Sequence, residues 1–444
     1  MNRDVLTYLC RSFYLKKHPV LQEKRSYKEN YCRALDYFVR KHDSGNDTFA
    51  FSMLEHYCNS LSGEEYLPQT FTPLAESEIK HAMRKIAALK IKRFKALTYR
   101  FVFVVDCLFL CAFLDENAAK AILQDLKVFF PTRCHRKLDL LFSALYRGTA
   151  LEKGMDSVAE LVSFWNREKK FFETPIKTIL VTATMSAGKS TLINAVVGKR
   201  LMRTAQEACT GHICRLYNKP FEDGENSVSA SQLIFDADAD TLLATEKAGD
   251  CQIASSYRTF AEAQNRVCII DTPGTNSAIN RSHGVTAKKA IRDCQYNLLV
   301  YVLNANQLGT DNEISHLKYI AENVPKEKVI FVLNKADIFE MSEDSIEESI
   351  QGVKADLVQL GYEAPVVYPI SAYFSLLIKL KLAEVPLDKI KEKKLAIYME
   401  QYSIPEYDLG RYYNVSYENA GDDILTQMSI RCGLYGLENI LLGE

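Results

Sequence analysis

The stretch from Ile176 to Thr191 reads IKTILVTATMSAGKST, and its pattern decides the fold of the second half of the chain. Residues 176–181 are largely apolar and β-branched, which is typical of a buried strand. The small and polar residues ATMSAGKS follow at 183–190, and apolar residues resume at Leu192. This order predicts a strand, a phosphate-binding loop and a helix, in which backbone N–H groups at the helix N-terminus surround a polyphosphate.

Two side chains of this loop have the chemistry that nucleotide phosphates need. Lys189 supplies a positive charge, and Ser190 supplies a hydroxyl for Mg²⁺. Ala183 stands where such loops usually carry glycine, so a Gly-Lys-Ser that merely begins a helix is the alternative. The residues expected to line the phosphates are Thr184, Met185, Ser186, Ala187, Gly188, Lys189, Ser190 and Thr191.

Composition limits the class of protein. The chain has 444 residues, of which 47% are hydrophobic and 25% charged, so it is long enough for two or three globular domains. Its formal net charge of -1 provides no general attraction for nucleic acid, and we predict no specific nucleic-acid partner. The 12 cysteines show no CxxC spacing, and the first residues lack the apolar region of a signal peptide. We therefore expect reduced thiols and a cytoplasmic location, with peripheral contact at a membrane as an open alternative.

The first 170 residues have helical periodicity throughout, which predicts an all-α N-terminal domain over residues 1–170. Residues 79–97 form the pattern of an amphipathic helix with one basic face. That face fits a solvated bundle helix or a surface for lipid, nucleic acid or a partner. The apolar run Phe101 to Leu114 holds Asp106 and is too short to span a bilayer, so we predict a buried helix there. Further helices are expected over 116–130, 136–146 and 155–169.

The period changes from helical to extended at Thr174-Pro175, which marks a second domain over residues 171–444. Apolar runs separated by helical stretches predict a mostly parallel sheet with helices on both faces, that is, an α/β fold. The polar and acidic residues 218–254 are expected to form a long excursion with a hairpin. The predicted strands lie at 176–181, 213–217, 266–270, 298–303, 328–333 and 366–370.

Three residues are candidates for the phosphate end of a site. Asp271 follows an apolar strand, where ligands of such sheets bind, and its carboxylate can reach Mg²⁺ through water. Gly274, three residues further on, can present its N–H to a γ-phosphate. Thr210 precedes the second strand and can complete the Mg²⁺ shell. We expect Ser190, Thr210 and Asp271 to be the residues that hold the metal.

A second set of residues is suited to reading a base. Asn334-Lys335-Ala336-Asp337 follows the strand that ends at Leu333. The Asp337 carboxylate can accept hydrogen bonds from N1 and the 2-amino group of guanine, whereas adenine offers no such pair of donors. Ser371 and Ala372 follow the last predicted strand and are expected to supply the loop over the base.

This ordered set of motifs resembles the P-loop GTPase superclass, and its details resemble the bacterial dynamin-like large GTPases. The resemblance rests on TMSAGKSTLINA at 184–195, EACT at 207–210 and NANQLGTD at 304–311, within residues 175–371. It implies binding of GTP and GDP with Mg²⁺, hydrolysis of GTP, and catalytic roles for Lys189, Ser186, Thr210 and Gly274. Gly433 and the residues after it are similar to the closing helix of such domains, which implies a helical insertion at about residues 373–431.

One departure from the family concerns catalysis. Met185 stands where eukaryotic dynamins carry a glutamine that helps to hold the attacking water, and a thioether cannot do so. Thr275 stands where small signalling GTPases carry their water-positioning residue. We therefore expect slow hydrolysis, or hydrolysis stimulated by assembly with a second copy or a paired GTPase across the nucleotide face.

Three interpretations remain open at this stage. The first is a GTPase whose segments 199–210 and 274–284 switch with the nucleotide. The second is a nucleotide-gated scaffold that does not hydrolyse GTP and works within a hetero-oligomer, as Met185 suggests. The third is a membrane-remodelling dynamin-like protein. The lack of a C-terminal stalk or lipid-binding tail in this sequence counts against it, unless the basic helix or the insertion replaces that tail or the chain is a truncation.

Overall fold

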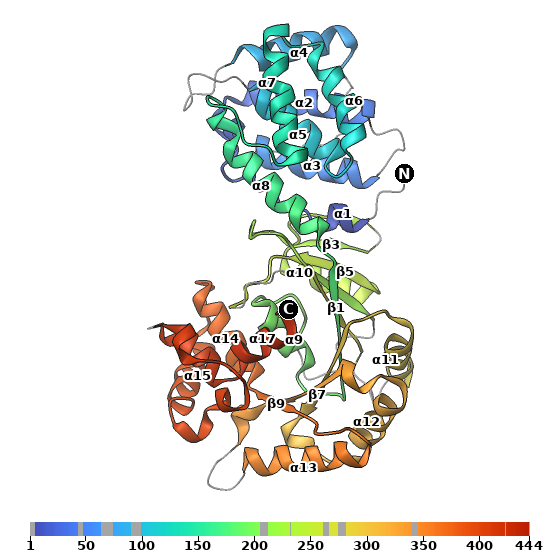
Figure 1. Ribbon diagram of the computed structural model, residues 1–444, viewed down its shortest axis with the longest axis vertical. Helices are drawn as coiled ribbons and strands as arrows, with labels where there is room; N and C mark the ends of the chain where they lie inside the picture. The colour runs from blue at the N-terminus through green and yellow to red at the C-terminus, as the bar shows by residue number, and fades with distance from the viewer. Residues whose placement is uncertain are drawn as a thin grey trace. The chain divides into compact units, whose positions relative to one another are not determined.

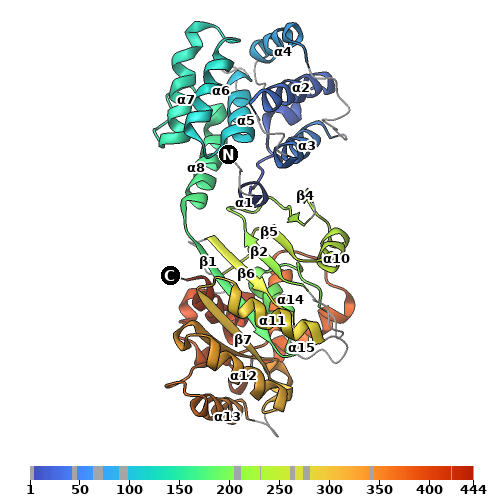
Figure 2. The same ribbon diagram turned by 90° about the vertical axis from the view of Figure 1, so that its right-hand side faces the viewer.

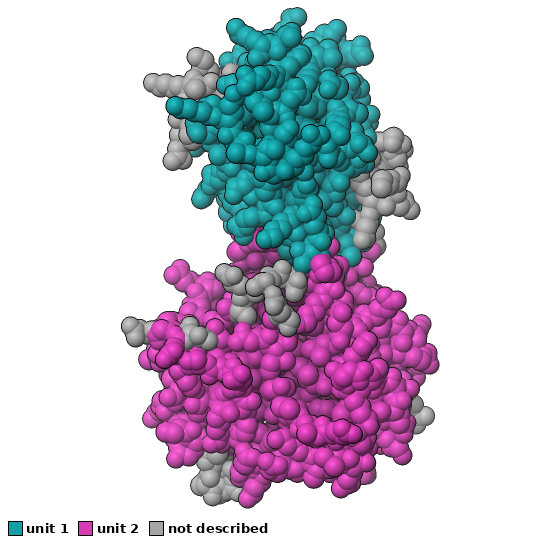
Figure 3. Space-filling model, viewed as in Figure 1, with its two compact units in different colours: residues 1–174, 233–235 teal, residues 175–232, 236–444 magenta. Residues whose placement is uncertain are grey.

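The structure is a computed structural model, in which the chain divides into two compact units (Figures 1 and 3). Unit 1 comprises residues 1–174 and 233–235, and unit 2 comprises residues 175–232 and 236–444. The structure describes residues 5–42, 48–63, 74–89, 99–204, 212–230, 232–260, 266–273, 281–339, 345–421 and 423–443.

Unit 1 is helical, and α5 lies among its other helices (Figure 2). Helix α5 carries the apolar run predicted to be buried, and it contacts α2, α3, α4, α6 and α8. Burial of residues 101–112 removes a continuous apolar surface from water, which is the main stabilising contribution to such a bundle. The helices are α1 (Val5–Leu9), α2 (Arg25–His42), α3 (Thr48–Ser62), α4 (Glu76–Ala88), α5 (Arg100–Ala112), α6 (Glu116–Lys127), α7 (His135–Arg147) and α8 (Asp156–Glu173).

Asp106 is a polar residue in the centre of the apolar helix α5. Its carboxylate accepts hydrogen bonds from the hydroxyls of Tyr31, at 2.5 Å, and Tyr57, at 2.9 Å, and lies 3.1 Å from Nε2 of His18. Buried polar groups are tolerated when they are paired in this way. The charge that argued against a membrane span is therefore part of a hydrogen-bond network inside unit 1. None of the described helices is both long and apolar enough to cross a bilayer.

The predicted amphipathic helix over residues 79–97 is shorter in the structure. Helix α4 ends at Ala88, with Leu89 in an extended conformation. Residues 90–98, which supply most of the predicted basic face, lie outside the described residues. Ile79, Met83 and Ile86 are buried, as their spacing predicts.

Unit 2 contains a sheet whose strands lie in the order β3-β5-β2-β6-β1-β7-β8-β9. The pairs β6-β1, β1-β7, β7-β8 and β8-β9 are parallel, as is β2-β5, whereas β2-β6 and β3-β5 are antiparallel. The predicted mostly parallel α/β sheet after a helical region is thus confirmed. The described strands of the whole chain are β1 (Ile176–Ala183), β2 (Cys214–Asn218), β3 (Ser227–Ser229), β4 (Leu233–Ile234), β5 (Cys251–Ser255), β6 (Arg266–Asp271), β7 (Leu298–Asn304), β8 (Val329–Asn334) and β9 (Val367–Ile370).

The sequence was misleading for residues 218–254. They were expected to form a polar excursion rather than a core element, but β5 is an internal strand of the sheet with Ile253 and Ala254 buried. The strand is only five residues long, and its register pairs Cys214 with Cys251. Pairing with β2 and β3 on its two sides therefore stabilises a strand whose own periodic signal is weak.

Helices cover both faces of this sheet. Figure 1 shows α14 and α17 on one side of the strands and α11 and α12 on the other, and α9 contacts both α14 and α17. The first helix of the predicted insertion, α14, is buried along most of its length and belongs to this layer. The helices are α9 (Lys189–Val197), α10 (Ala239–Ala248), α11 (Arg281–Asp293), α12 (Asp311–Asn323), α13 (Ile346–Gln359), α14 (Ala372–Leu382), α15 (Lys389–Gln401), α16 (Ile424–Arg431) and α17 (Leu434–Leu442).

Candidate functional site

The loop between β1 and α9 has the backbone of an anion-binding loop. Ser186 has a φ of 63° and Gly188 a φ of 83°, both in the left-handed region, and α9 begins at Lys189. A Cβ atom at Gly188 would lie 2.4 Å from Nδ2 of Asn334. Only glycine fits this position, because it accepts the positive φ and leaves room for the asparagine. A loop of this shape before a helix N-terminus turns N–H groups toward an anion.

Lys189 and Asp271 form a buried ion pair at this loop. Asp271 is the last residue of β6, and it is in register with Val181 of the adjacent strand β1. Burial raises the pKa of Asp271, and the charge of Lys189 opposes that change. One oxygen of the Asp271 carboxylate, Oδ2, is buried and has no hydrogen-bond partner among the described residues. The pair therefore offers one positive group and one unsatisfied acceptor beside the loop.

Asn334 connects two of the predicted motifs. It is the last residue of β8, and its Nδ2 donates a hydrogen bond to the carbonyl of Ala187 at 2.9 Å. Its Oδ1 accepts a hydrogen bond from the backbone N–H of Ala372 at 3.1 Å. Both polar ends of this buried side chain are thus paired. Lys335 follows with a φ of 67°, and this left-handed residue turns the chain into the short 3₁₀ helix Ala336–Ile338.

The Asp337 carboxylate is held by two hydroxyl groups. Ser371 donates a hydrogen bond from Oγ to Oδ1 at 2.6 Å, and Tyr398 donates one from its hydroxyl to Oδ2 at 3.3 Å. The same serine caps α14, since its Oγ accepts a hydrogen bond from the N–H of Phe374. Asp337, Ser371 and Ala372 therefore lie together, as their positions after β8 and β9 predicted.

The remaining predicted residues are distributed as follows. Thr184, Ser190 and Thr191 are half-buried in or beside the loop, and Met185 is 37% exposed. Thr210 and Gly274 lie outside the described residues, as do most of the predicted switch segments. The structure therefore brings together the phosphate loop, Asp271, the Asn334 motif and the Ser371 motif.

Two further residues at this site had no assigned role in the sequence analysis. Asn304 ends β7 and donates a hydrogen bond to the carbonyl of Ser186 at 3.3 Å. Because β7 lies between β1 and β8, the position of Asn304 at its end could have identified this residue from the sequence. Glu246 of α10 accepts a hydrogen bond from the N–H of Arg203 at 3.3 Å, and burial raises its pKa to about 7. Nothing in the polar segment around Glu246 distinguishes it from its exposed acidic neighbours.

Comparison with known proteins supplies the family. The model of the dynamin family matches residues 179–336, which hold the loop, Asp271 and Asn334. Residues 179–336 resemble the dynamin family, and we name the domain that holds them, unit 2, the dynamin-family domain. The resemblance seen in the motifs is thereby confirmed. The phosphate loop, Asp271 and Asn334 lie inside the matched segment, whereas Asp337, Ser371 and Ala372 follow it in the chain.

The dynamin-family domain is similar to parts of longer proteins. A "Probable transmembrane GTPase FZO-like, chloroplastic" from Arabidopsis thaliana is 30% identical over 212 residues, which are 47% of this chain and 20% of that protein. "Dynamin-like protein A" from Bacillus subtilis (strain 168) is 26% identical over 117 residues, 26% of this chain and 10% of that protein. This chain thus spans a small part of either relative. A solved structure of an oligomerised bacterial dynamin pair has a TM-score of 0.37 and 15% identity over 88% of this chain and 59% of that one.

Proposed function

We propose that the dynamin-family domain binds GTP and GDP and hydrolyses GTP in the presence of Mg²⁺. The observation that carries this proposal is the hydrogen bond from Asn334 to Ala187, which joins the base-reading motif to the phosphate loop. Binding of a guanine nucleotide needs two elements side by side: a motif with Asp337 for the base and a loop with Lys189 for the phosphates. The relative that is named as a probable transmembrane GTPase supports the same function.

Mg²⁺ fits the residues present. The unpaired Oδ2 of Asp271 is a buried acceptor, and a carboxylate of this kind accepts hydrogen bonds from the water shell that Mg²⁺ retains. Ser190 is the hydroxyl residue at the start of α9 and would be a direct ligand. Thr210 is proposed as the third metal-holding residue. When bound, the metal neutralises negative charge on the β- and γ-phosphate oxygens.

The residues of the chain would act by position and charge. Lys189, released from Asp271, would pair with the phosphates, and the N–H groups of the loop would donate to them. Gly274 is proposed to donate its N–H to the γ-phosphate, and Ser186 to help hold a monovalent cation. Lys335, Asp337, Ser371 and Ala372 would bind the base. Catalysis would come from stabilising the charge that develops on the oxygen between the β- and γ-phosphorus atoms.

A second candidate function rests on Met185. Its thioether is 37% exposed on the loop, and it offers no strong hydrogen bond to an attacking water. Slow basal hydrolysis that increases on self-association, or with a paired GTPase across the nucleotide face, follows from this property. A scaffold that binds GTP without hydrolysing it is the limiting case.

A role at membranes is also a proposal. One relative is named as a transmembrane GTPase, and this dynamin-family domain would contact a membrane peripherally. Co-sedimentation with anionic liposomes at low and high salt tests this point, because electrostatic binding weakens as salt increases. Protein that stays in the supernatant at low salt would argue against a membrane role.

The main experiment measures turnover of GTP and of ATP over a range of protein concentrations, with and without Mg²⁺. We expect turnover of GTP only, dependence on Mg²⁺, and a specific activity that increases with protein concentration. Turnover of ATP at a similar rate would refute the base-reading role of Asp337. Binding of GTP without turnover at any concentration would favour the scaffold.

A further inference from the structure

Helix α15, which lies outside the segment matched by the family model, contacts the base-reading motif at two points. The hydroxyl of Tyr398 donates to Oδ2 of Asp337 at 3.3 Å. Nε2 of Gln401 donates to the backbone carbonyl of the same aspartate at 3.2 Å. Both the side chain and the main chain of Asp337 are therefore hydrogen-bonded to one helix of the insertion.

The end of α15 is held in place by aromatic packing. The ring of Tyr398 lies 5.5 Å from that of Phe374 and 6.2 Å from that of Tyr373, both on α14. Tyr402, which is fully buried, stacks on Phe374 with ring centroids 5.1 Å apart. Nη1 of Arg431 donates to the carbonyl of Tyr402 at 3.0 Å. These contacts fix the direction from which Tyr398 approaches Asp337.

We propose that Tyr398 is a positioning residue for guanine recognition, which holds the Asp337 carboxylate in the orientation that accepts the base. This inference rests on the proposed function, since it assigns a role toward the same base. The proposal also assigns a role to α15. This helix of the insertion would complete the guanine site, although it lies outside the segment that the family model covers.

The hydrogen-bond capacity of a carboxylate supports this role. Each of its two oxygens can accept about two hydrogen bonds. Ser371 occupies one position on Oδ1, and Tyr398 occupies one on Oδ2. One position on each oxygen is left for the N1 and 2-amino donors of guanine. The two hydroxyls thus prevent rotation of the carboxylate without consuming the acceptors that the base needs.

The protonation state of Tyr398 suits a residue that donates a hydrogen bond. Burial raises its pKa, and the negative charge of Asp337 adds to this effect. The hydroxyl therefore keeps its proton over the physiological range of pH and remains a donor to the Asp337 carboxylate. Loss of this hydroxyl would leave Oδ2 with one fixed contact fewer and let the carboxylate turn.

The test uses Tyr398→Phe in the full chain, because phenylalanine keeps the ring contacts with α14 and removes only the hydroxyl. Affinities for GDP and for ADP are measured by competition against a fluorescent guanine nucleotide, with ADP extended to millimolar concentration. We expect GDP to bind about fivefold to tenfold more weakly, with ADP affinity unchanged, because a hydrogen bond to a charged group contributes to guanine binding alone.

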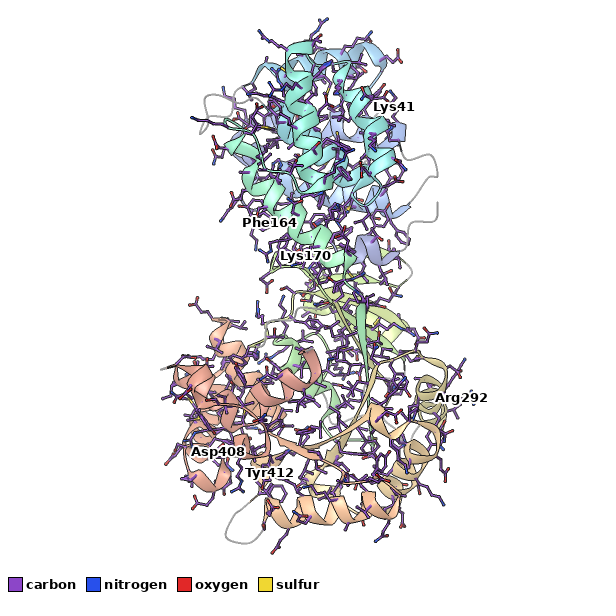
Figure 4. All side chains as sticks on the ribbon, in the orientation of Figure 1. Lys41, Phe164, Lys170, Arg292, Asp408 and Tyr412 are labelled. Atoms are coloured by element: carbon purple, nitrogen blue, oxygen red, sulfur yellow. The ribbon has the colours of Figure 1, made fainter. Side chains whose placement is uncertain are left out.

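The matched control is Tyr412→Phe. Tyr412 belongs to the segment between α15 and α16 and is labelled in Figure 4; its hydroxyl donates to Glu347 at 2.9 Å rather than to Asp337. This variant likewise loses one hydrogen bond from a tyrosine hydroxyl to a carboxylate, but it should keep the GDP affinity of the wild type. A Tyr398→Phe variant whose GDP affinity stays within twofold of wild type overturns the inference. A wild-type protein that binds no GDP overturns the proposed function as well.

Discussion

Nδ2 of Asn334 lies 2.9 Å from the carbonyl oxygen of Ala187, so the end of β8 is fastened to the phosphate loop that follows β1. Strand β7 lies between these two strands, and its last residue, Asn304, reaches the same loop at the carbonyl of Ser186. Two asparagines at neighbouring strand ends therefore hold one loop. The loop is stabilised before any nucleotide binds, which lowers the entropy cost of binding.

The first prediction concerns Asn334→Ala. The substitution removes a donor and an acceptor, and it leaves the Ala187 carbonyl and the Ala372 N–H without their partners. Each unsatisfied buried group costs about 1–3 kcal/mol, so we expect a lower melting temperature and at least tenfold weaker GDP binding. Thermal unfolding and calorimetric titration measure the two effects.

Asn323→Ala is the matched control for this substitution. The Asn323 side chain donates to the carbonyl of Tyr319 at 2.8 Å on an exposed turn of α12. Its removal should change the melting temperature little and leave GDP binding intact. Equal effects of the two substitutions would show that Asn334 does not link the loops.

The second prediction compares two glycines. Gly188→Ala places a Cβ atom 2.4 Å from Nδ2 of Asn334 at a φ of 83°, so we expect loss of nucleotide binding and a less stable domain. Gly352 lies in the exposed middle of α13 with nothing within 4 Å of an added Cβ. Gly352→Ala should raise stability by about 0.5–1 kcal/mol and leave binding unchanged. Normal GDP affinity in Gly188→Ala would contradict the loop geometry described above.

Much of unit 2 could be predicted from the sequence because its signals are local and repeated. Each of the six predicted strands is present. The functional residues at the ends of four of these strands lie together at one edge of the sheet, as parallel topology requires. Asp271 and Asn334 were therefore identifiable from their positions alone. Their places in the order of the motifs carried more information than their residue types.

The missed features depend on contacts between distant segments. Tyr398 reaches Asp337 across 61 positions of sequence, and no periodic pattern marks a tyrosine on a basic helix as a partner of that aspartate. Strand β5 is short, and it is stabilised by strands on both of its sides rather than by its own composition. Such tertiary contacts override local propensity, and they cannot be inferred from the residue pattern of a single sequence.

The third prediction tests base selection. Asp337→Asn exchanges one acceptor oxygen for an amide donor, which fits the carbonyl at position 2 of xanthine better than the 2-amino group of guanine. We expect GTP binding to weaken by about tenfold or more and xanthosine triphosphate binding to strengthen, by competition against a fluorescent nucleotide. An unchanged preference for guanine would place base reading elsewhere in the molecule.

The last prediction concerns the pH dependence of stability. Glu313 of α12 is 2% exposed, and burial raises its pKa to about 7, from 4.5 in an unfolded chain. The folded protein thus holds a proton that the unfolded chain releases, so stability decreases as pH rises from about 4.5 to 7. Glu313→Gln removes this decrease and keeps an oxygen for the N–H of Gly309, which donates to Glu313 at 3.0 Å.

We therefore expect Glu313→Gln to match the wild type near pH 5 and to exceed its unfolding free energy at pH 8 by on the order of 1 kcal/mol. Urea unfolding at pH 5, 6, 7 and 8 measures the difference. His316 on the same helix has its pKa lowered to about 4 by burial, but both proteins contain it, so its contribution cancels. Glu322→Gln, on the exposed side of α12, removes the same charge without burial and should give a difference that does not change with pH. A difference for Glu313→Gln that is constant from pH 5 to 8 would mean that the Glu313 carboxyl is ionised in the folded protein over that whole range.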